Sequence, residues 1–238
     1  MKTNEKLLLK SSQLFIHNYV TCKHQKMIEI EIRNRLNKYE KLGIEKQSNG
    51  TELIGKAPHI APLAYLHSIY KGLNNDEIGR LEQELKTEIP KDYKEFLKFS
   101  NGLHIFNTTL YLNGLRESYN RQKAIENRLP FALSTKNLFE RPRNAKPEYF
   151  FIGGYDYGNG SLLYVNKNNN KVYRCGTKNV KPLNEWNSVN EMILTEIDRL
   201  IELHSANGEL KENIKKTTPE NNFEFDKQGL WNRLKNMF

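Results

Sequence analysis

The chain has 238 residues, of which 37% are hydrophobic and 27% charged, and its net charge at neutral pH is +9. This length fits one large domain or one ordinary domain with extensions. No apolar run approaches the roughly 18 residues of a membrane span. The basic N-terminus lacks a small-residue cleavage site, which argues against a signal peptide. We therefore expect a soluble cytoplasmic protein without a membrane span.

The first 72 residues are predicted to form a helical extension. Apolar residues recur at roughly helical spacing over residues 4–42, in two pieces, although the alternating run 27–32 also fits a strand. Residues 47–58 contain two glycines, a proline and Asn-Gly, which is typical of a loop or linker. A short apolar helix is expected to begin at Pro62 and to end near Gly72.

Two helices are predicted next. The first begins near Asn75, which precedes two acidic residues that suit a helix N-terminus. Pro90 suits the first turn of the second helix. Its aromatic residues at 93 and 96 share a face with Leu97, so we expect them in the core rather than stacked on a ligand. Asn101-Gly102 ends this helix, because both residues tolerate a left-handed conformation.

The following residues are predicted to form a β meander. Residues 104–114 are β-rich, and strands are expected near 149–152, 161–165 and 171–175, joined by tight polar loops. Short links between neighbouring strands favour antiparallel pairing. The polar segment between these strands contains one expected helix near residues 121–128.

The chain is predicted to close with a helix and a polar tail. Ser188 and Glu191 form a capping-box pattern in front of a strongly amphipathic run. The tail, residues 206–238, ends in GLWNRLKNMF, which is expected to form a short amphipathic helix.

The ordered segments IPKDYKEFLKFSNG, FFIGGYDYGNGSLLYVN, KVYRCG and WNSVNEMI resemble the SUKH superfamily, which includes the yeast cell-wall-assembly regulator and many bacterial immunity proteins. The matching positions are Leu85, Ile89, Pro90, Tyr93, Phe96, Leu97, Asn101, Gly102, Ile152, Gly153, Gly158, Val165, Val172, Tyr173 and the final helix. The resemblance covers roughly residues 73–205 and implies an α+β fold with helices packed on a mainly antiparallel sheet. Residues 1–72 and 206–238 are expected to be additions to this domain.

The resemblance also implies a function. Bacterial members look like antitoxins that bind and neutralise toxin domains, often nucleases, and they share no catalytic motif. A non-enzymatic immunity protein with a cognate toxin domain as partner is therefore expected. Two alternatives stay open: a nucleic-acid-binding accessory protein that uses basic surfaces, and a regulatory scaffold like the yeast relatives.

The residues themselves indicate no catalytic, cofactor or metal site. The glycine-rich loop 153–160 lacks the Gly-Lys-Ser/Thr ending of a P-loop and leads into a strand-like segment. No histidine lies at metal-ligand spacing from a suitable partner, and the HExxH and GxSxG motifs do not occur. Cys22 and Cys175 are far apart and form no CxxC pair, so they are expected to be reduced, mostly buried thiols.

One candidate contact site for a partner is the tip of the glycine-rich loop, formed by Tyr155, Asp156 and Tyr157. Tyrosine is enriched at interface hot spots, and the acidic residue could meet a cation on the partner. We therefore expect these three side chains to form an exposed recognition tip.

Arg141 and Arg143 are the second candidate. They lie in the segment 121–146, which carries seven Lys and Arg against two Glu and interleaves two phenylalanines. Such a segment suits nucleic acid, or it is simply a solvated loop. Many nuclease toxins are basic, so a basic inhibitor would need either a local acidic patch or an acidic partner.

Overall fold

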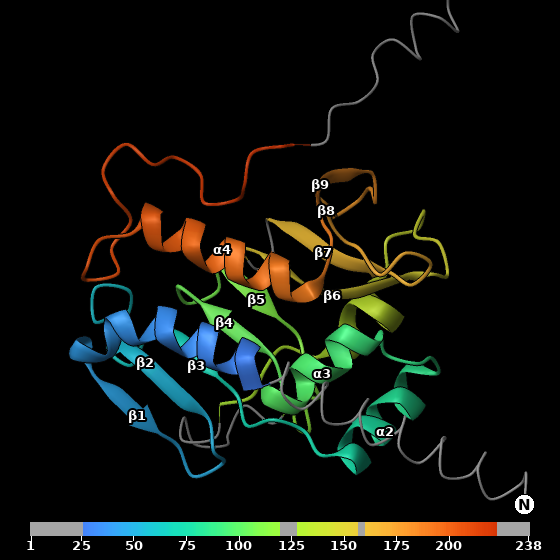
Figure 1. Cartoon of the computed structure of the whole chain (residues 1–238), viewed down its shortest axis with the longest axis horizontal. Helices are drawn as coiled ribbons and strands as arrows, with labels where there is room; N and C mark the ends of the chain where they lie inside the picture. Colours follow the sequence, from blue (N-terminus) through green and yellow to red (C-terminus); the bar gives the residue numbers. More distant parts are fainter. Residues whose placement is uncertain (1–25, 120–127, 157–159, 223–238) are drawn as a thin grey trace, which may run out of the picture.

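In the computed structural model of the chain, residues 26–119, 128–156 and 160–222 are described. Nine strands form one sheet in chain order, and each pairs antiparallel with the next (Figure 1). The strands are β1 (Ile44–Lys46), β2 (Glu52–Lys56), β3 (Tyr65–Ile69), β4 (Leu103–Ile105), β5 (Leu110–Leu112), β6 (Tyr149–Tyr155), β7 (Ser161–Asn166), β8 (Val172–Gly176) and β9 (Pro182–Trp186). The helices are residues 26–36, η1 (Asn37–Leu42), α2 (Asn75–Leu85), α3 (Lys91–Phe99), η3 (Thr135–Phe139) and α4 (Val189–Leu203). The predicted α+β fold is confirmed.

The N-terminal third holds strands as well as a helix. Residues 26–36 are helical, with Ile28, Ile32 and Leu36 buried at four-residue intervals, so the strand alternative for this run is wrong. The loop predicted over residues 47–58 and the helix predicted from Pro62 are also wrong, because β2 and β3 lie there. The Asn-Gly pair is the hairpin turn between β1 and β2, where Gly50 has φ 84°.

Helices α2 and α3 form as predicted, with a shift at the start of α2 and another at the end of α3, which ends at Phe99 with Ser100 as an extended C-cap rather than at Asn101-Gly102. Asn74, not Asn75, is the N-cap: its side chain accepts from the amide of Glu77, and the Glu77 carboxylate accepts from the Asn74 amide. This reciprocal capping box satisfies two amides that the helix leaves open. Tyr93 and Phe96 are buried and stacked with ring centroids 5.5 Å apart, which confirms the expected core role.

The main core lies between the sheet and the helices that cover one of its faces. Figure 1 shows α4 and helix 26–36 side by side over this face. Their contact includes an ion pair of 2.9 Å between Arg35 and Asp198. A smaller apolar cluster contains Phe151, Tyr164 and Cys175. Burial raises the pKa of the Cys175 thiol to about 12, so this thiol stays protonated and unreactive.

The β meander is confirmed and extended. The three strands predicted between residues 149 and 175 are β6, β7 and β8, and the β-rich run 104–114 holds β4 and β5. Strand β9, at the edge of the sheet, was not predicted. The helix expected near 121–128 and the apolar end of the tail lie almost wholly outside the described residues.

Asn101 and Gly102 join α3 to the sheet. The Asn101 side chain accepts from the Leu115 amide at 2.6 Å and donates to the Leu115 carbonyl at 2.8 Å. Gly102 has φ 92°, and a Cβ atom there would lie 2.7 Å from the Leu112 carbonyl oxygen. These residues therefore fix the path of the backbone.

Asn101→Ala is expected to lower the free energy of unfolding by about 2 kcal/mol, because it leaves a buried amide and a buried carbonyl unpaired. Urea unfolding measures this change. Asn37→Ala, at an exposed position, is the control. Equal loss of stability in both variants would contradict the assigned role of Asn101.

Candidate functional site

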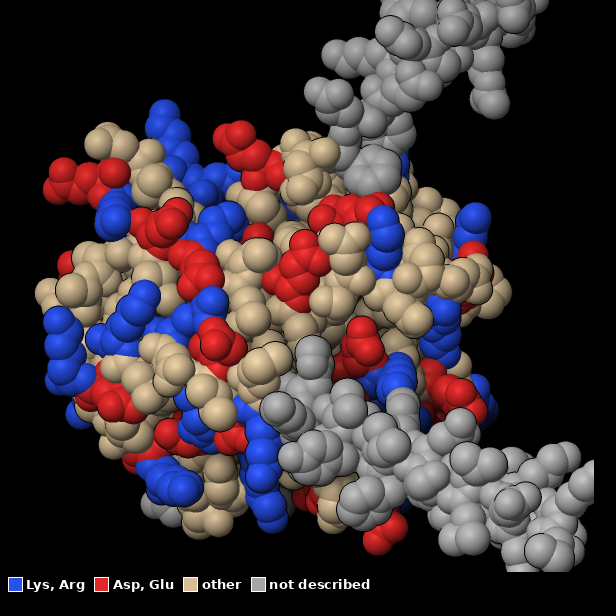
Figure 2. Space-filling model, viewed as in Figure 1, with Lys and Arg blue, Asp and Glu red and all other residues tan. Residues whose placement is uncertain are grey.

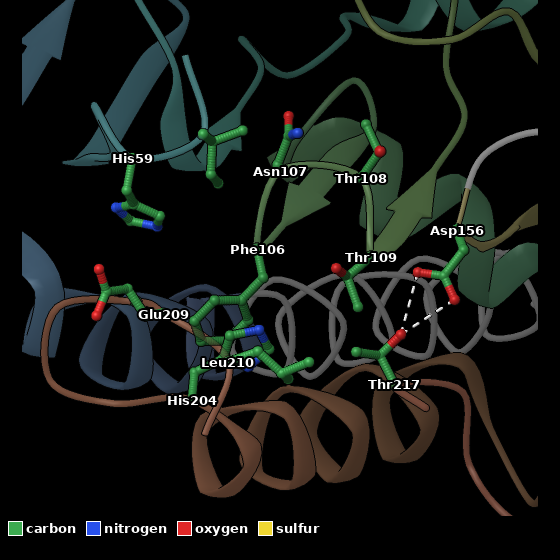
Figure 3. A pocket seen from close by; sticks show the side chains of 12 residues that line it. His59, Phe106, Asn107, Thr108, Thr109, Asp156, His204, Glu209, Leu210 and Thr217 are labelled. Atoms are coloured by element: carbon green, nitrogen blue, oxygen red, sulfur yellow. Dashed lines mark hydrogen bonds between the residues drawn. The ribbon is translucent and has the colours of Figure 1, made fainter. Parts of the chain in front are cut away.

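A groove of about 500 Å³ opens beside the turn between β4 and β5 (Figure 3). Its other walls come from the β2–β3 loop, the end of β6 and the segment that follows α4. The groove is lined by His59, Ile60, Phe106, Asn107, Thr108, Thr109, Asp156, His204, Gly208, Glu209, Leu210 and Thr217.

The β4–β5 turn is held in an uncommon conformation. Phe106 and Asn107 have φ values of 46° and 64°. Asparagine tolerates this left-handed region, but a bulky residue rarely adopts it. Phe106 is fixed by packing: its ring stacks on His204 with centroids 3.7 Å apart and meets His67 edge-on at 4.9 Å. Strained backbone of this kind is concentrated at functional sites, and Asp156, also on the groove, has φ 42°.

The segment of residues 205–222, here called the strap, forms one wall of the groove. Figure 1 shows it running back alongside α4 towards β9. Buried Arg174 donates to the Pro219 carbonyl at 2.9 Å and to the Asn221 side chain at 2.7 Å. At the groove itself, the Thr217 hydroxyl is 3.1 and 3.0 Å from the two carboxylate oxygens of Asp156. The strap is therefore fastened to the sheet at both places.

Arg174→Ala is expected to loosen the strap, because it removes the donor to Pro219 and Asn221. Amide exchange in residues 217–222 should become about tenfold faster, corresponding to about 1.4 kcal/mol of local stability. Arg80→Ala, at a side chain that is 62% exposed, is the matched control. Unchanged exchange in the Arg174 variant would show that other contacts hold the strap.

The groove combines negative charge with apolar surface. Its lining contains the carboxylates of Asp156 and Glu209 but no Lys or Arg. Burial raises the pKa of Asp156, and the Thr217 hydroxyl and the charge of Arg199 oppose this effect. Ile60 and Leu210, 44% and 41% exposed, supply apolar contact area. Such a surface suits a cationic side chain with an apolar stem, because partly desolvated carboxylates gain most from a new counter-charge.

The face of the molecule shown in Figure 2 has no single sign of charge. Figure 2 shows Lys and Arg interspersed with Asp and Glu over the face it presents. Among the described residues, no group of three or more His, Cys, Asp or Glu is placed to hold a metal ion. The lining of the groove carries two carboxylates and no Lys or Arg, on a chain whose net charge is +9, while Arg199 and Lys211 lie close enough to act on His204.

Of the three residues predicted to form an exposed tip, Tyr155, Asp156 and Tyr157, only Asp156 is found at the groove. Tyr155 is 1% exposed and packs in the main core, so its predicted exposure is wrong. The cause is an irregularity in the pairing of β6 with β7 between Phe151 and Gly153, which shifts the alternation by one residue and puts Tyr155 on the same face as Phe150 and Ile152. Asp156 lines the groove, while Tyr157 lies outside the described residues.

The two arginines proposed from sequence do not line the groove. Arg141 is half-buried: its guanidinium lies 5.4 Å from the centroid of the Phe151 ring and donates to the Lys146 carbonyl. Burial lowers the pKa of Arg141. Arg143 is exposed on the same loop. These arginines and Asp156 therefore belong to separate surfaces.

Most residues of the groove could not be predicted from the sequence. His59, Phe106 and Glu209 are far apart in the chain and carry no shared motif. The Asn-Thr-Thr run after Phe106 is a turn signal of the kind that marks loops. Nothing in the sequence shows, however, that this turn meets the strap.

Part of the chain matches a known protein family. Residues 72–195 match the model of the SMI1/KNR4 family (SUKH-1), which covers more than half of the chain. No curated protein matches the chain. The turn at Phe106 and Asp156 lie inside the matched region, whereas His59 and Glu209 lie outside it. In the part of the chain that the structure describes, no helix has the length and apolar character needed to cross a membrane.

Proposed function

The chain belongs to the SMI1/KNR4 family (SUKH-1), and from this premise we propose that it is a non-enzymatic immunity protein. In this role it binds a cognate toxin domain in the cytoplasm and blocks its action. Family membership supports an immunity-type or regulatory protein, and the groove favours the first of these two roles.

The single observation that carries the proposal is the negative charge of the groove. A toxin that cuts nucleic acid needs a basic surface, because its substrate is a polyanion. An inhibitor with a net charge of +9 must meet that surface through a local acidic patch. Asp156 and Glu209, flanked by the exposed apolar side chains of Ile60 and Leu210, provide such a patch.

The additions to the family domain contribute to this surface. His59 comes from the β2–β3 loop, and Glu209 and Thr217 come from the strap, all outside the matched residues. We therefore propose that the segments before residue 72 and after residue 205 adapt a common domain to one partner. Such additions would give specificity, which depends on contacts that other partners cannot make.

Co-expression tests the proposed function. The toxin encoded beside the gene for this chain would be produced with and without the full-length chain, and cell growth and complex formation would be measured together. Protection of growth and a complex that survives purification at moderate salt are expected. Absence of both protection and complex would reject the immunity role for that toxin.

A further inference from the structure

A second cavity, of about 300 Å³, lies away from the groove. It is lined by Tyr111, Asn113, Arg116, Tyr119, Phe131, Ala132, Thr135 and Lys136. Its volume is at the lower end of the range for small-molecule sites. None of these residues lines the groove, so the proposed partner contact does not account for this cavity.

The walls of this cavity are held by backbone pairing. Gly114 bridges to Ala132: its amide donates to the Phe131 carbonyl at 2.9 Å, and its carbonyl accepts from Leu133 at 2.8 Å. The Tyr93 hydroxyl donates to the carbonyl of Asn113. The residues on either side of the cavity are therefore fixed before any ligand arrives, which reduces the entropy lost on binding.

Two polar atoms of the cavity residues are buried without a partner. Asn113 is 2% exposed, and its side-chain oxygen makes no hydrogen bond within the described part of the protein. The Nε–H group of Arg116 is likewise buried and unpaired, although the same guanidinium donates to the Pro130 carbonyl at 2.9 Å. Most buried polar atoms in proteins are paired. Both atoms are buried from the solvent, so a ligand reaches them only when the two side chains turn towards the cavity. A ligand that pairs with both atoms must then offer one hydrogen-bond donor and one acceptor.

Aromatic rings and positive charge complete the lining. Tyr111 and Phe131 meet edge-on with centroids 5.2 Å apart, and the Arg116 guanidinium lies 5.4 Å from the centroid of the exposed Tyr119 ring. Arg116 and Lys136 are the charged residues of the lining, which contains no carboxylate. Lys136 pairs with Glu140 outside the cavity, and an anion could share this lysine.

We propose that this cavity binds a nucleotide. A nucleobase is a planar ring system that stacks on aromatic side chains and carries donors and acceptors on its edge. Once their side chains turn towards the cavity, the Asn113 oxygen and the Arg116 Nε–H would bind that edge, and Lys136 would contact the phosphate. The nucleotide comes either from the free pool or from an unpaired stretch of a nucleic-acid strand, since both present the same chemistry.

Calorimetric titration of the full-length chain tests this proposal. The probes are the four ribonucleoside monophosphates, the corresponding nucleosides, inorganic phosphate and a short single-stranded RNA. At least one nucleotide should bind, and it should bind more tightly than its nucleoside or phosphate alone. Equal affinity for a mononucleotide and the strand indicates the free nucleotide, whereas much tighter binding of the strand indicates nucleic acid.

Three variants separate site binding from general attraction by a basic protein. Arg116→Gln should weaken binding at least about tenfold, whereas Lys38→Gln, which removes one charge from an exposed position outside the cavity, should leave it unchanged. Asn113→Leu should abolish binding without lowering stability, because it removes an unpaired buried atom. The proposal is overturned if no nucleotide or strand binds, if phosphate alone binds equally well, or if Lys38→Gln and Arg116→Gln weaken binding alike.

Discussion

Lowering the pH from about 7 to about 5 is expected to remove about 4 kcal/mol from the free energy of unfolding. The cause is the burial of His67 and His104, whose pKa values are each lowered to about 3 by desolvation, with smaller effects from His204 on the first and from Arg128 and Arg116 on the second. In the unfolded chain both histidines titrate near their ordinary pKa of about 6.5. The unfolded state therefore takes up protons first.

The direction of this effect follows from the two pKa values. Stability is complete above pH of about 6.5 and falls by up to about 1.4 kcal/mol per pH unit for each histidine as the pH drops towards 3. Urea unfolding at a series of pH values measures the slope. His104→Gln should remove about half of it, whereas Asn37→Ala, at an exposed position without a titrating side chain, should leave it unchanged. A slope that is identical in the His104 variant and the parent would contradict this account.

Reversing the charge of the groove is expected to weaken partner binding about 100-fold, or about 2.7 kcal/mol. The variant combines Glu209→Lys, at an exposed side chain, with Asp156→Asn, whose amide oxygen can still accept from Thr217. A cationic group placed opposite a basic toxin surface adds repulsion to the lost attraction. Calorimetric titration with the cognate toxin domain measures the change.

The control for this variant is Glu84→Lys, an exposed position on α2 outside the groove. Affinity in the parent should also fall as salt is raised, because exposed charges are screened. If Glu84→Lys weakens binding as much as the groove variant does, the contact depends on net charge rather than on this surface.

The helices could be predicted because their signals are local. Ser188 caps α4 by accepting from the Glu191 amide, and both residues are visible in the sequence at the expected spacing. The apolar faces of α3 and α4 repeat with helical periodicity. Strands β6 to β8 were equally clear, since each is a short apolar run between polar turn residues.

Strands β2 and β3 were missed because their burial hides the pattern that identifies a strand. Leu53 and Ile54 are adjacent and both fully buried, as are Leu66 and His67 in β3. A strand buried on both faces shows no alternation, and a short apolar run of this kind cannot be told from a helix by periodicity. Only pairing with β1 and β4 decides the conformation, and that pairing is not written in the local sequence.

The candidate site was predictable only at Asp156. Its neighbour Tyr155 carries the stronger interface signal by residue type but points into the core. The rest of the groove is assembled from loops that are about 50 to 150 residues apart in the chain, such as those of His59, Phe106 and Glu209. The glycine-rich and aromatic motifs lie on β6 and the loop after it. Glu209, the acidic residue of the strap, lies in a tail that contains no motif.

Hydrogen–deuterium exchange of the chain alone and in complex with its toxin domain would test the central claim most directly, because it locates the contact without a mutation. If the toxin domain binds at the groove, exchange in the complex is expected to slow at the β4–β5 turn, residues 106–109, and in residues 208–217 of the strap. Protection confined to the loop of Arg141 and Arg143, with exchange at the groove unchanged, would contradict it.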